Sequence, residues 1–227
     1  MLRKWEDIPD FMKNDSVKEY YDILNKKRFS LFFKRLFDII VSFLMLIIIS
    51  PVYLILAIAI KIDSKGPVFY RQTRITSYGK EFRIHKFRTM IDNADKKGNL
   101  ITLNEDDRVT KVGKLIRKIR LDETGQLIDI LLGNMSFVGT RPEVPKYVKH
   151  YSDEMLATLL LPAGVTSNAS IEYKDEDDLL KDSENSEKIY IEKIMPKKMK
   201  YNLNDIKDFT FFRDFKIMIK TVVAVIR

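Results

Sequence analysis

The stretch IIVSFLMLIIISPVYLILAIAI, residues Ile39 to Ile60, is an apolar run of 22 residues without a single charge. A helix needs about 20 such residues to cross the hydrocarbon core of a bilayer. Ser50 and Pro51 interrupt the run near its middle. Proline lacks the N–H that bonds back one turn, and its ring crowds a preceding carbonyl, so it breaks or bends a helix. The pattern predicts a membrane helix broken at Ser50-Pro51.

Positive charge flanks this run on both sides, and Lys/Arg excess marks the cytoplasmic side of a membrane segment. The cations before the run are Lys26, Lys27, Arg28, Lys34 and Arg35, and those after it are Lys61, Lys65, Arg71 and Arg74. A helix hairpin that enters and leaves at one face satisfies both flanks, whereas a straight span satisfies only one. We therefore expect a re-entrant helix hairpin over residues 31–62. A kinked true span and a buried helix of a soluble protein are the alternatives.

The remainder of the chain predicts an α+β fold attached to this membrane segment. Residues 66–75 (GPVFYRQTRI) and 80–90 (KEFRIHKFRTM) have the β-branched and aromatic content and the bounding turn residues of a small β-hairpin. Residues 108–120 and 212–227 predict basic amphipathic helices, which suit a membrane interface or the surface of a core.

The organisation that follows has three parts. Residues 1–30 form an N-terminal extension, residues 31–62 the membrane helix, and residues 63–227 a cytosolic domain with interfacial helices. At 227 residues, the chain is long enough for one domain with an attached segment.

Charge is unevenly distributed along the chain, which has a formal net charge of +8. Residues 61–120 hold 16 Lys/Arg against 7 Asp/Glu, and this excess predicts an anionic partner. Residues 171–187 hold 8 acids and 2 lysines, which is typical of a solvated surface. The chain has no cysteine, so disulfides and thiolate metal sites are excluded.

Two adjacent acids, Asp122 and Glu123, follow the basic stretch in RLDETGQL (residues 120–127). Neighbouring side chains converge only at a helix start, where Asp122 would be the N-cap and Gly133 would end the helix. Cap and dipole preferences alone would also place two acids there. The surrounding cations favour a chemical role because Lys and Arg clusters bind phosphate. These cations are Lys86, Arg88, Arg117 and Arg141.

An acid pair among cations allows two kinds of phosphate chemistry. Asp122 and Glu123 could hold Mg²⁺, with substrate phosphates completing its coordination shell. Alternatively, one carboxylate could attack phosphorus and divide a transfer into two steps.

Several segments, taken in order, resemble the bacterial sugar transferases and more narrowly the small monotopic phosphoglycosyl transferases. These segments are KRLFDIIVSFLMLIIISPVYLILAIAI, GPVFYRQTRITSYGKEFRIHKFRTM, RVTKVGKLIRKIRLDETGQLIDILLGNMSFVGTRPE and DFKIMIKTVV. The resemblance runs from about residue 33 to the end of the chain. It implies transfer of a phospho-sugar from a UDP-sugar to polyprenyl (undecaprenyl) phosphate with release of UMP. This would be the first membrane step of glycoconjugate synthesis, at the cytoplasmic face of the bacterial inner membrane.

The resemblance also implies roles for individual residues. Asp122 would be the covalent nucleophile, and Glu123 would help to hold Mg²⁺. Lys86, Arg117 and Arg141 would bind phosphate, and the Ser50-Pro51 pair would make the membrane helix re-entrant. The catalytic domain would then be residues 63–227.

The sequence departs from the family pattern at four positions: Thr124-Gly125 replaces Leu-Pro, Asn134 replaces Asp, and Thr140 replaces Pro. The competing function is a non-enzymatic scaffold that is anchored in the membrane and binds anionic lipid or nucleic acid. Nucleic-acid surfaces usually exclude carboxylates, so the acid pair leads us to expect no nucleic-acid partner.

Overall fold

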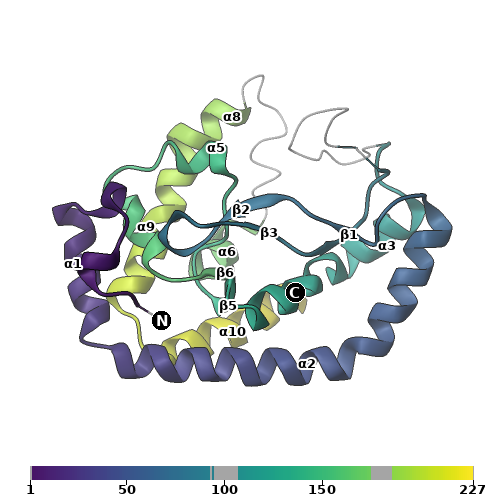
Figure 1. The fold of residues 1–227 in the computed structure, drawn as a ribbon. Helices are drawn as coiled ribbons and strands as arrows, with labels where there is room; N and C mark the ends of the chain where they lie inside the picture. The colour runs from purple at the N-terminus through teal and green to yellow at the C-terminus, as the bar shows by residue number, and fades with distance from the viewer. Residues whose placement is uncertain (1, 93, 95–106, 175–185, 227) are drawn as a thin grey trace.

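The computed structural model describes residues 2–92, 94, 107–174 and 186–226. Figure 1 shows that one long helix, α2 (Arg28–Asp63), runs along the lower edge of the molecule and then bends upward, with the rest of the chain above it. The other helices of eight or more residues are α1 (Asp15–Asn25), α3 (Lys111–Lys118), α9 (Met195–Lys207) and α10 (Phe211–Ile226). This mixture of helices with small sheets confirms the α+β prediction.

Short helices fill the connections. The 3-10 helices are η1 (Trp5–Asp7), η2 (Asp10–Met12), η3 (Ser77–Gly79), η5 (Leu121–Gly125) and η6 (Met155–Leu160), and η7 (Tyr190–Ile194) is a π-helix. The short α-helices are α4 (Gln126–Leu131), α5 (Pro145–Val148), α6 (Asn168–Glu172) and α8 (Ser186–Ile189). The predicted acidic surface, residues 171–187, lies mostly outside the described residues.

The predicted break in the membrane helix is a bend within one continuous helix of 36 residues. Pro51 cannot donate to the carbonyl of Ile47, four residues earlier. The hydroxyl of Ser50 donates to that same carbonyl at 2.8 Å. The Ser-Pro pair therefore satisfies the acceptor that the proline leaves open, as bends in apolar surroundings require.

Most of α2 exposes apolar side chains. Within its most apolar window only 11% is buried, and α2 is the one described helix long and apolar enough to cross a membrane. The alternative of a buried soluble helix is therefore wrong. The exposed apolar residues include Phe29, Phe33, Ile40, Phe43, Ile47, Ile48, Leu54, Ile55, Ile58 and Ile62. Whether α2 forms a re-entrant hairpin remains a prediction.

Two of the flanking cations behind that prediction are used inside the protein. Lys34 is buried, pairs with Asp214 of α10 and donates to the carbonyl of Val138 at 2.9 Å. Arg35 donates to two carbonyls at the end of α4. These contacts fix α2 to the body of the protein, so neither side chain counts simply as a surface charge that marks the cytoplasmic side.

The described residues form three two-stranded sheets, which lie above α2 in Figure 1. Strands β1 (Phe69–Tyr70) and β4 (Lys86–Phe87) pair antiparallel, as do β2 (Thr73–Ile75) and β3 (Glu81–Arg83). This confirms the predicted hairpin. Its two arms pair in two separate stretches, β1 with β4 and β2 with β3. The parallel pair of β5 (Met135–Val138) and β6 (Ala163–Thr166) was not predicted.

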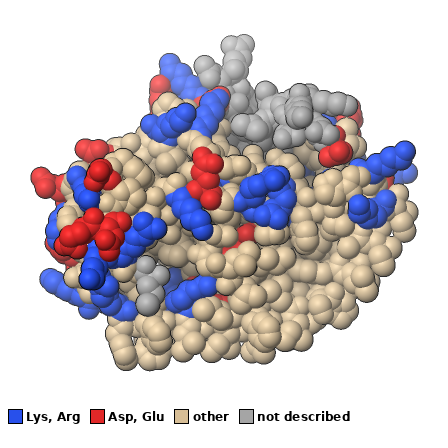
Figure 2. All heavy atoms as spheres, in the orientation of Figure 1, with Lys and Arg blue, Asp and Glu red and all other residues tan. Residues whose placement is uncertain are grey.

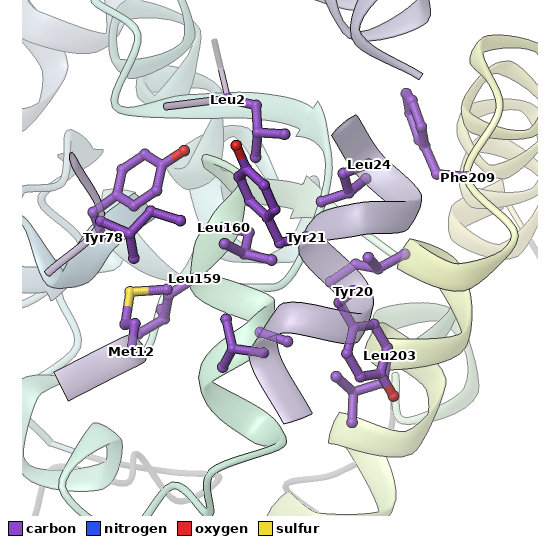
Figure 3. Close-up of a cluster of buried hydrophobic side chains, with 14 of the residues drawn as sticks. Leu2, Met12, Tyr20, Tyr21, Leu24, Tyr78, Leu159, Leu160, Leu203 and Phe209 are labelled. Atoms are coloured by element: carbon purple, nitrogen blue, oxygen red, sulfur yellow. The ribbon is translucent and has the colours of Figure 1, made fainter. Parts of the chain in front are cut away.

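The N-terminal segment packs into a core rather than lying apart. Figure 3 shows Tyr20, Tyr21 and Leu24 of α1 in one buried cluster with Leu160 and Leu203, from distant parts of the chain. Residues 2–24 are thus part of the folded body. The three-part domain boundaries remain predictions.

The two predicted amphipathic helices are present as α3 and α10. Within α3, Ile116 is buried whereas Leu115 is exposed, and Ile119, the C-cap of α3, is exposed as well. In α10 the exposed apolar residues are Phe212, Phe215, Ile219, Val222 and Val223. Figure 2 shows a broad lower surface without acidic or basic side chains, where α2 lies in the same view of Figure 1. This surface has the character of a membrane contact, and its contact with lipid remains a prediction.

Candidate active site

Asp122 and Glu123 lie in η5, a single 3-10 turn that we call the dyad turn. Arg120 precedes it in a left-handed conformation, with φ of 53°, which reverses the chain directly after α3. The α-helix α4 begins only at Gln126, so the prediction of Asp122 as its N-cap is wrong. The predicted stop at Gly133 is confirmed, because this residue has φ of 84° just beyond α4.

Glu123 is the centre of a charged cluster formed by three segments. Its Oε1 accepts from Lys86 Nζ of β4 at 2.9 Å and from Arg141 Nη2 at 2.5 Å. Arg141 Nη1 lies 3.5 Å from Oε2, so the guanidinium meets both carboxylate oxygens. The sequence predicts a phosphate-binding role for Lys86 and Arg141, and the structure brings both to the dyad.

Burial and charge act in opposite directions on these groups. Burial raises the pKa of Glu123, but Arg141 and Lys86 lower it by more, so the pKa of this carboxyl lies well below its ordinary value. Burial raises the pKa of Asp122, and the charge of Glu123 raises it further, against the opposing charges of Lys86 and Arg117. Burial lowers the pKa of Lys86. Of the two acids, Glu123 is the one held firmly as a carboxylate.

The other two predicted cations have different positions. Arg117 donates through Nε to the hydroxyl of Thr89 at 2.8 Å, and its charge acts on Asp122. Arg88 is 4% exposed and donates to the carbonyl and hydroxyl of Ser64, the C-cap of α2. Arg88 therefore anchors the end of α2, and this geometry gives no support to phosphate binding by its side chain.

A cavity of about 680 Å³ adjoins the dyad turn. Its polar wall includes Lys86, Glu123 and Arg141, together with Arg120, which directly precedes the dyad turn. Its apolar wall includes Met45 and Ile49 of α2, Leu127, Phe137 of β5, Val165 of β6 and Ala224 of α10. Asp122 is not among the lining residues. The cavity thus joins a cationic surface to the apolar helix α2.

Several tyrosines form a further part of the cavity wall, and no spacing in the sequence marked them. Tyr147, Tyr173 and Tyr190 line it. The hydroxyl of Tyr190 donates to Glu143, two residues after Arg141. These contacts join parts of the chain that are distant in the sequence, so only the folded structure reveals them.

A buried contact behind the cluster fixes Lys86. Asp129, which is fully buried, accepts from the backbone N–H of His85 and lies 2.8 Å from its Nδ1. A Cβ at Gly125 would lie 2.8 Å from the carbonyl oxygen of His85, so glycine allows the dyad turn to pack closely on β4. His85 therefore has a structural role, because its backbone and ring both contact the buried Asp129.

Asp122 and Glu123 are adjacent carboxylates on the dyad turn, and among the described residues no three His, Asp or Glu side chains converge as a metal site. Two carboxylates with no third protein ligand fit Mg²⁺, which keeps several waters and is often bound through substrate phosphates.

Sequence comparison defines the class of protein to which this site belongs. The profile of the family described as bacterial sugar transferase matches residues 29–227. The chain therefore belongs to the bacterial sugar transferase family, and residues 1–28 lie outside the match.

Relatives with named activities share this region. The chain is 39% identical over 197 residues to the UDP-glucose:undecaprenyl-phosphate glucose-1-phosphate transferase of Klebsiella pneumoniae, covering 84% of this chain and 39% of that protein. It is 40% identical over 124 residues to the UDP-N-acetylgalactosamine-undecaprenyl-phosphate N-acetylgalactosaminephosphotransferase of Aeromonas hydrophila, covering 55% of this chain and 29% of that protein. It is 33% identical over 189 residues to the uncharacterized sugar transferase EpsL of Bacillus subtilis, covering 83% of this chain and 85% of that protein.

Proposed function

We propose that this chain transfers a phospho-sugar from a UDP-sugar to undecaprenyl phosphate, with release of UMP. The observation that carries the proposal is the cluster of Lys86, Glu123 and Arg141 on the wall of a cavity that also reaches α2. Such a cavity suits two substrates that both carry phosphates, one of which also has a long apolar chain. The names of the relatives support the same general reaction.

The cations provide the binding of the donor. Arg141 presents a planar fork that matches phosphate oxygens, and Lys86 acts as a point charge. In the structure both cations are held by Glu123, so their positions are fixed before a diphosphate binds. The single carboxylate offsets only one of the two positive charges, which leaves one to attract the diphosphate. Electrostatic stabilisation of phosphoryl transfer depends on such fixed charges.

Asp122 is the proposed nucleophile. Its carboxylate oxygen would attack the phosphorus that carries the sugar, forming a carboxyl–phosphate bond as the bond to UMP breaks. An oxygen of the acceptor phosphate would then attack the same phosphorus and release the Asp122 carboxylate. Asp122 is adjacent to Glu123 on the dyad turn, close to the cations that would stabilise the departing phosphate.

Mg²⁺ is the proposed cofactor, held by Asp122 and Glu123 together with the phosphates of the donor. When bound, it would neutralise charge on the diphosphate and on the departing UMP. Arg141 and Lys86 would keep Glu123 oriented toward that site, since both contact its carboxylate.

The exposed apolar faces of α2 and α10 suit a bilayer that delivers the acceptor. We place the protein at the cytoplasmic face of the bacterial inner membrane, where nucleotide sugars are made. The apolar cavity wall, which includes Met45 and Ile49 of α2, would accept the chain of the lipid.

The test is UMP release by the purified protein in detergent or nanodiscs, with undecaprenyl phosphate, Mg²⁺ and a panel of UDP-sugars. We expect UMP and a sugar-diphospholipid from at least one donor, and loss of both with Asp122→Asn. A scaffold that only binds anionic lipid would release no UMP from any donor while still binding vesicles.

A further inference from the structure

The membrane helix touches the dyad turn directly through one side chain. Tyr53 lies in α2, and its hydroxyl donates to the backbone carbonyl of Thr124 at 2.5 Å. Thr124 directly follows Glu123. A contact therefore runs from the helix with the exposed apolar face to the residue beside the two acids.

A second contact holds the aromatic ring of Tyr53. The ring packs edge-on against Phe87, with ring centroids 4.9 Å apart. Phe87 is the neighbour of Lys86 in β4, so the same aromatic ring reaches both sides of the cluster: the strand that carries Lys86 and the turn that carries Glu123. The hydroxyl of Tyr53 makes the hydrogen bond to Thr124, whereas its ring makes the contact with Phe87, so replacing Tyr53 by phenylalanine removes only the hydrogen bond.

The bend of α2 determines where Tyr53 lies. Pro51 precedes it by two residues and is the proline inside the helix. Beyond the bend, Leu56 and Ile60 are buried with Phe87 and Ile116, which holds this arm of α2 on the body of the protein. Tyr53 lies between the bend and this apolar anchor, so its position depends on both.

The dyad turn is a short element, and contacts from other parts of the chain help to hold it. It is a single 3-10 turn, closed from within by the hydroxyl of Thr124, which donates to the carbonyl of Leu121 at 2.7 Å. The geometry of 3-10 hydrogen bonds is poorer than that of an α-helix. An outside hydrogen bond to the carbonyl of Thr124 therefore restricts the orientation of the preceding residues, Asp122 and Glu123.

We propose that Tyr53 is a positioning residue through which the bend of α2 sets the orientation of the dyad turn. The inference rests on the proposed function, because the turn is taken as the reaction centre. It gives the bend a role in the reaction besides its role in the membrane: the arm beyond Pro51 holds the acids in place for attack. Misplacement of a reacting group by about 1 Å can cost a hundredfold in rate.

The test compares Tyr53→Phe with Tyr21→Phe. Each change removes one hydroxyl that donates to a backbone carbonyl, and Tyr21 donates to the carbonyl of Arg3 at 3.2 Å in the N-terminal cluster. UMP release is measured for both variants and the wild type over a range of donor concentrations, together with the thermal unfolding midpoint.

For Tyr53→Phe we expect kcat to fall by about tenfold or more, while the donor KM changes by less than about threefold, the pattern of a lost positioning effect. The unfolding midpoint of Tyr53→Phe should match that of Tyr21→Phe, and Tyr21→Phe should keep wild-type kcat. A second arm adds Pro51→Ala. Because the hydroxyl acts through the bend, Tyr53→Phe should cost much less in the Pro51→Ala background than in the wild type.

Four results would overturn the inference. A kcat of Tyr53→Phe within about twofold of the wild type would do so. An equal loss of kcat in Tyr21→Phe would also overturn it, and so would a loss of kcat in Tyr53→Phe that is matched by a fall in its unfolding midpoint. The fourth result is full additivity, in which Tyr53→Phe lowers kcat by the same factor with and without Pro51→Ala. If the wild type releases no UMP from any donor, the proposed function fails first and this inference fails with it. If the wild type is active and Tyr53→Phe is unchanged, only the role of Tyr53 is lost.

Discussion

Arg141 meets Glu123 with both terminal nitrogens of its guanidinium, 2.5 Å from Nη2 to Oε1 and 3.5 Å from Nη1 to Oε2. This two-point contact fixes the plane of the guanidinium on the cavity wall. It also explains why the pKa of Glu123 stays low although burial acts to raise it. We therefore expect the geometry of Arg141 to matter for binding of the proposed donor.

Replacing Arg141 by lysine should impair UMP release without abolishing it. Lysine keeps the positive charge but has no fork, so one of the two contacts to Glu123 and the two-point contact to phosphate are lost. We expect kcat/KM for the donor to fall by about tenfold to a hundredfold, equivalent to about 1.4 to 2.7 kcal/mol. Arg213→Lys is the matched control, since Arg213 pairs with Asp205 and Asp208 on the surface. Wild-type kinetics in Arg141→Lys would exclude the fork from donor binding.

Glu123→Gln should raise the Mg²⁺ concentration needed for half-maximal UMP release. The change removes a negative charge from a site that we propose for a hard cation, and amide oxygen is a weaker ligand for such ions. The measurement is a Mg²⁺ titration at saturating donor. Glu192→Gln is the control, because Glu192 forms a surface ion pair with Lys188. An unchanged Mg²⁺ requirement in Glu123→Gln would remove Glu123 from the metal site.

Both ends of α2 should face the cytoplasm if the bend makes the helix re-entrant. Ser30→Cys and Lys65→Cys introduce single thiols near its two ends in a chain without cysteine. In intact cells neither should react with an impermeant thiol reagent, and both should react after permeabilisation. Reaction of either thiol in intact cells would contradict the re-entrant arrangement. With Ser50→Ala and Pro51→Ala added, the helix should straighten, and one thiol should become reactive from outside.

The N-terminal segment should contribute a pH-dependent part of stability. Burial, with the hydrogen bond to Glu154, raises the pKa of Tyr20 to about 12, against the charge of Lys207. A raised pKa in the folded state means that the neutral phenol is favoured, so this stabilisation is present below pH 10 and is lost as pH rises toward about 12. Tyr20→Phe should therefore show a weaker fall in the unfolding midpoint across this window than the wild type. Parallel pH profiles would contradict the link.

Local chemistry explains which features the sequence could predict. Pro51 predicts the bend of α2, and Ser50 supplies the hydroxyl that donates to the open carbonyl of Ile47. Both effects act within one turn of helix. The hairpin of β2 and β3 follows from alternating residues and a nearby turn. Adjacent acids and scattered cations indicated a phosphate site, and the structure brought Lys86 and Arg141 to Glu123.

Long-range packing explains what the sequence could not predict. The charge of Lys34 does not reveal that the side chain is buried against Asp214, and KFR does not reveal that Arg88 anchors the end of α2 while Lys86 reaches the dyad. The contact of Asp129 with His85 and that of Tyr53 with Thr124 join residues 44 and 71 positions apart. No periodicity within either segment encodes such a pairing.

The central claim is that Asp122 forms a covalent bond to the phosphorus of the donor, and the most direct test is mass spectrometry of acid-quenched enzyme after incubation with UDP-sugar and Mg²⁺ but no acceptor. We predict a mass increase equal to one phospho-sugar on the peptide that contains Asp122, a matching burst of UMP, and the loss of both in Asp122→Asn. Added undecaprenyl phosphate should discharge the adduct. An active wild type without any adduct or burst, together with near-normal turnover by Asp122→Asn, would contradict the account.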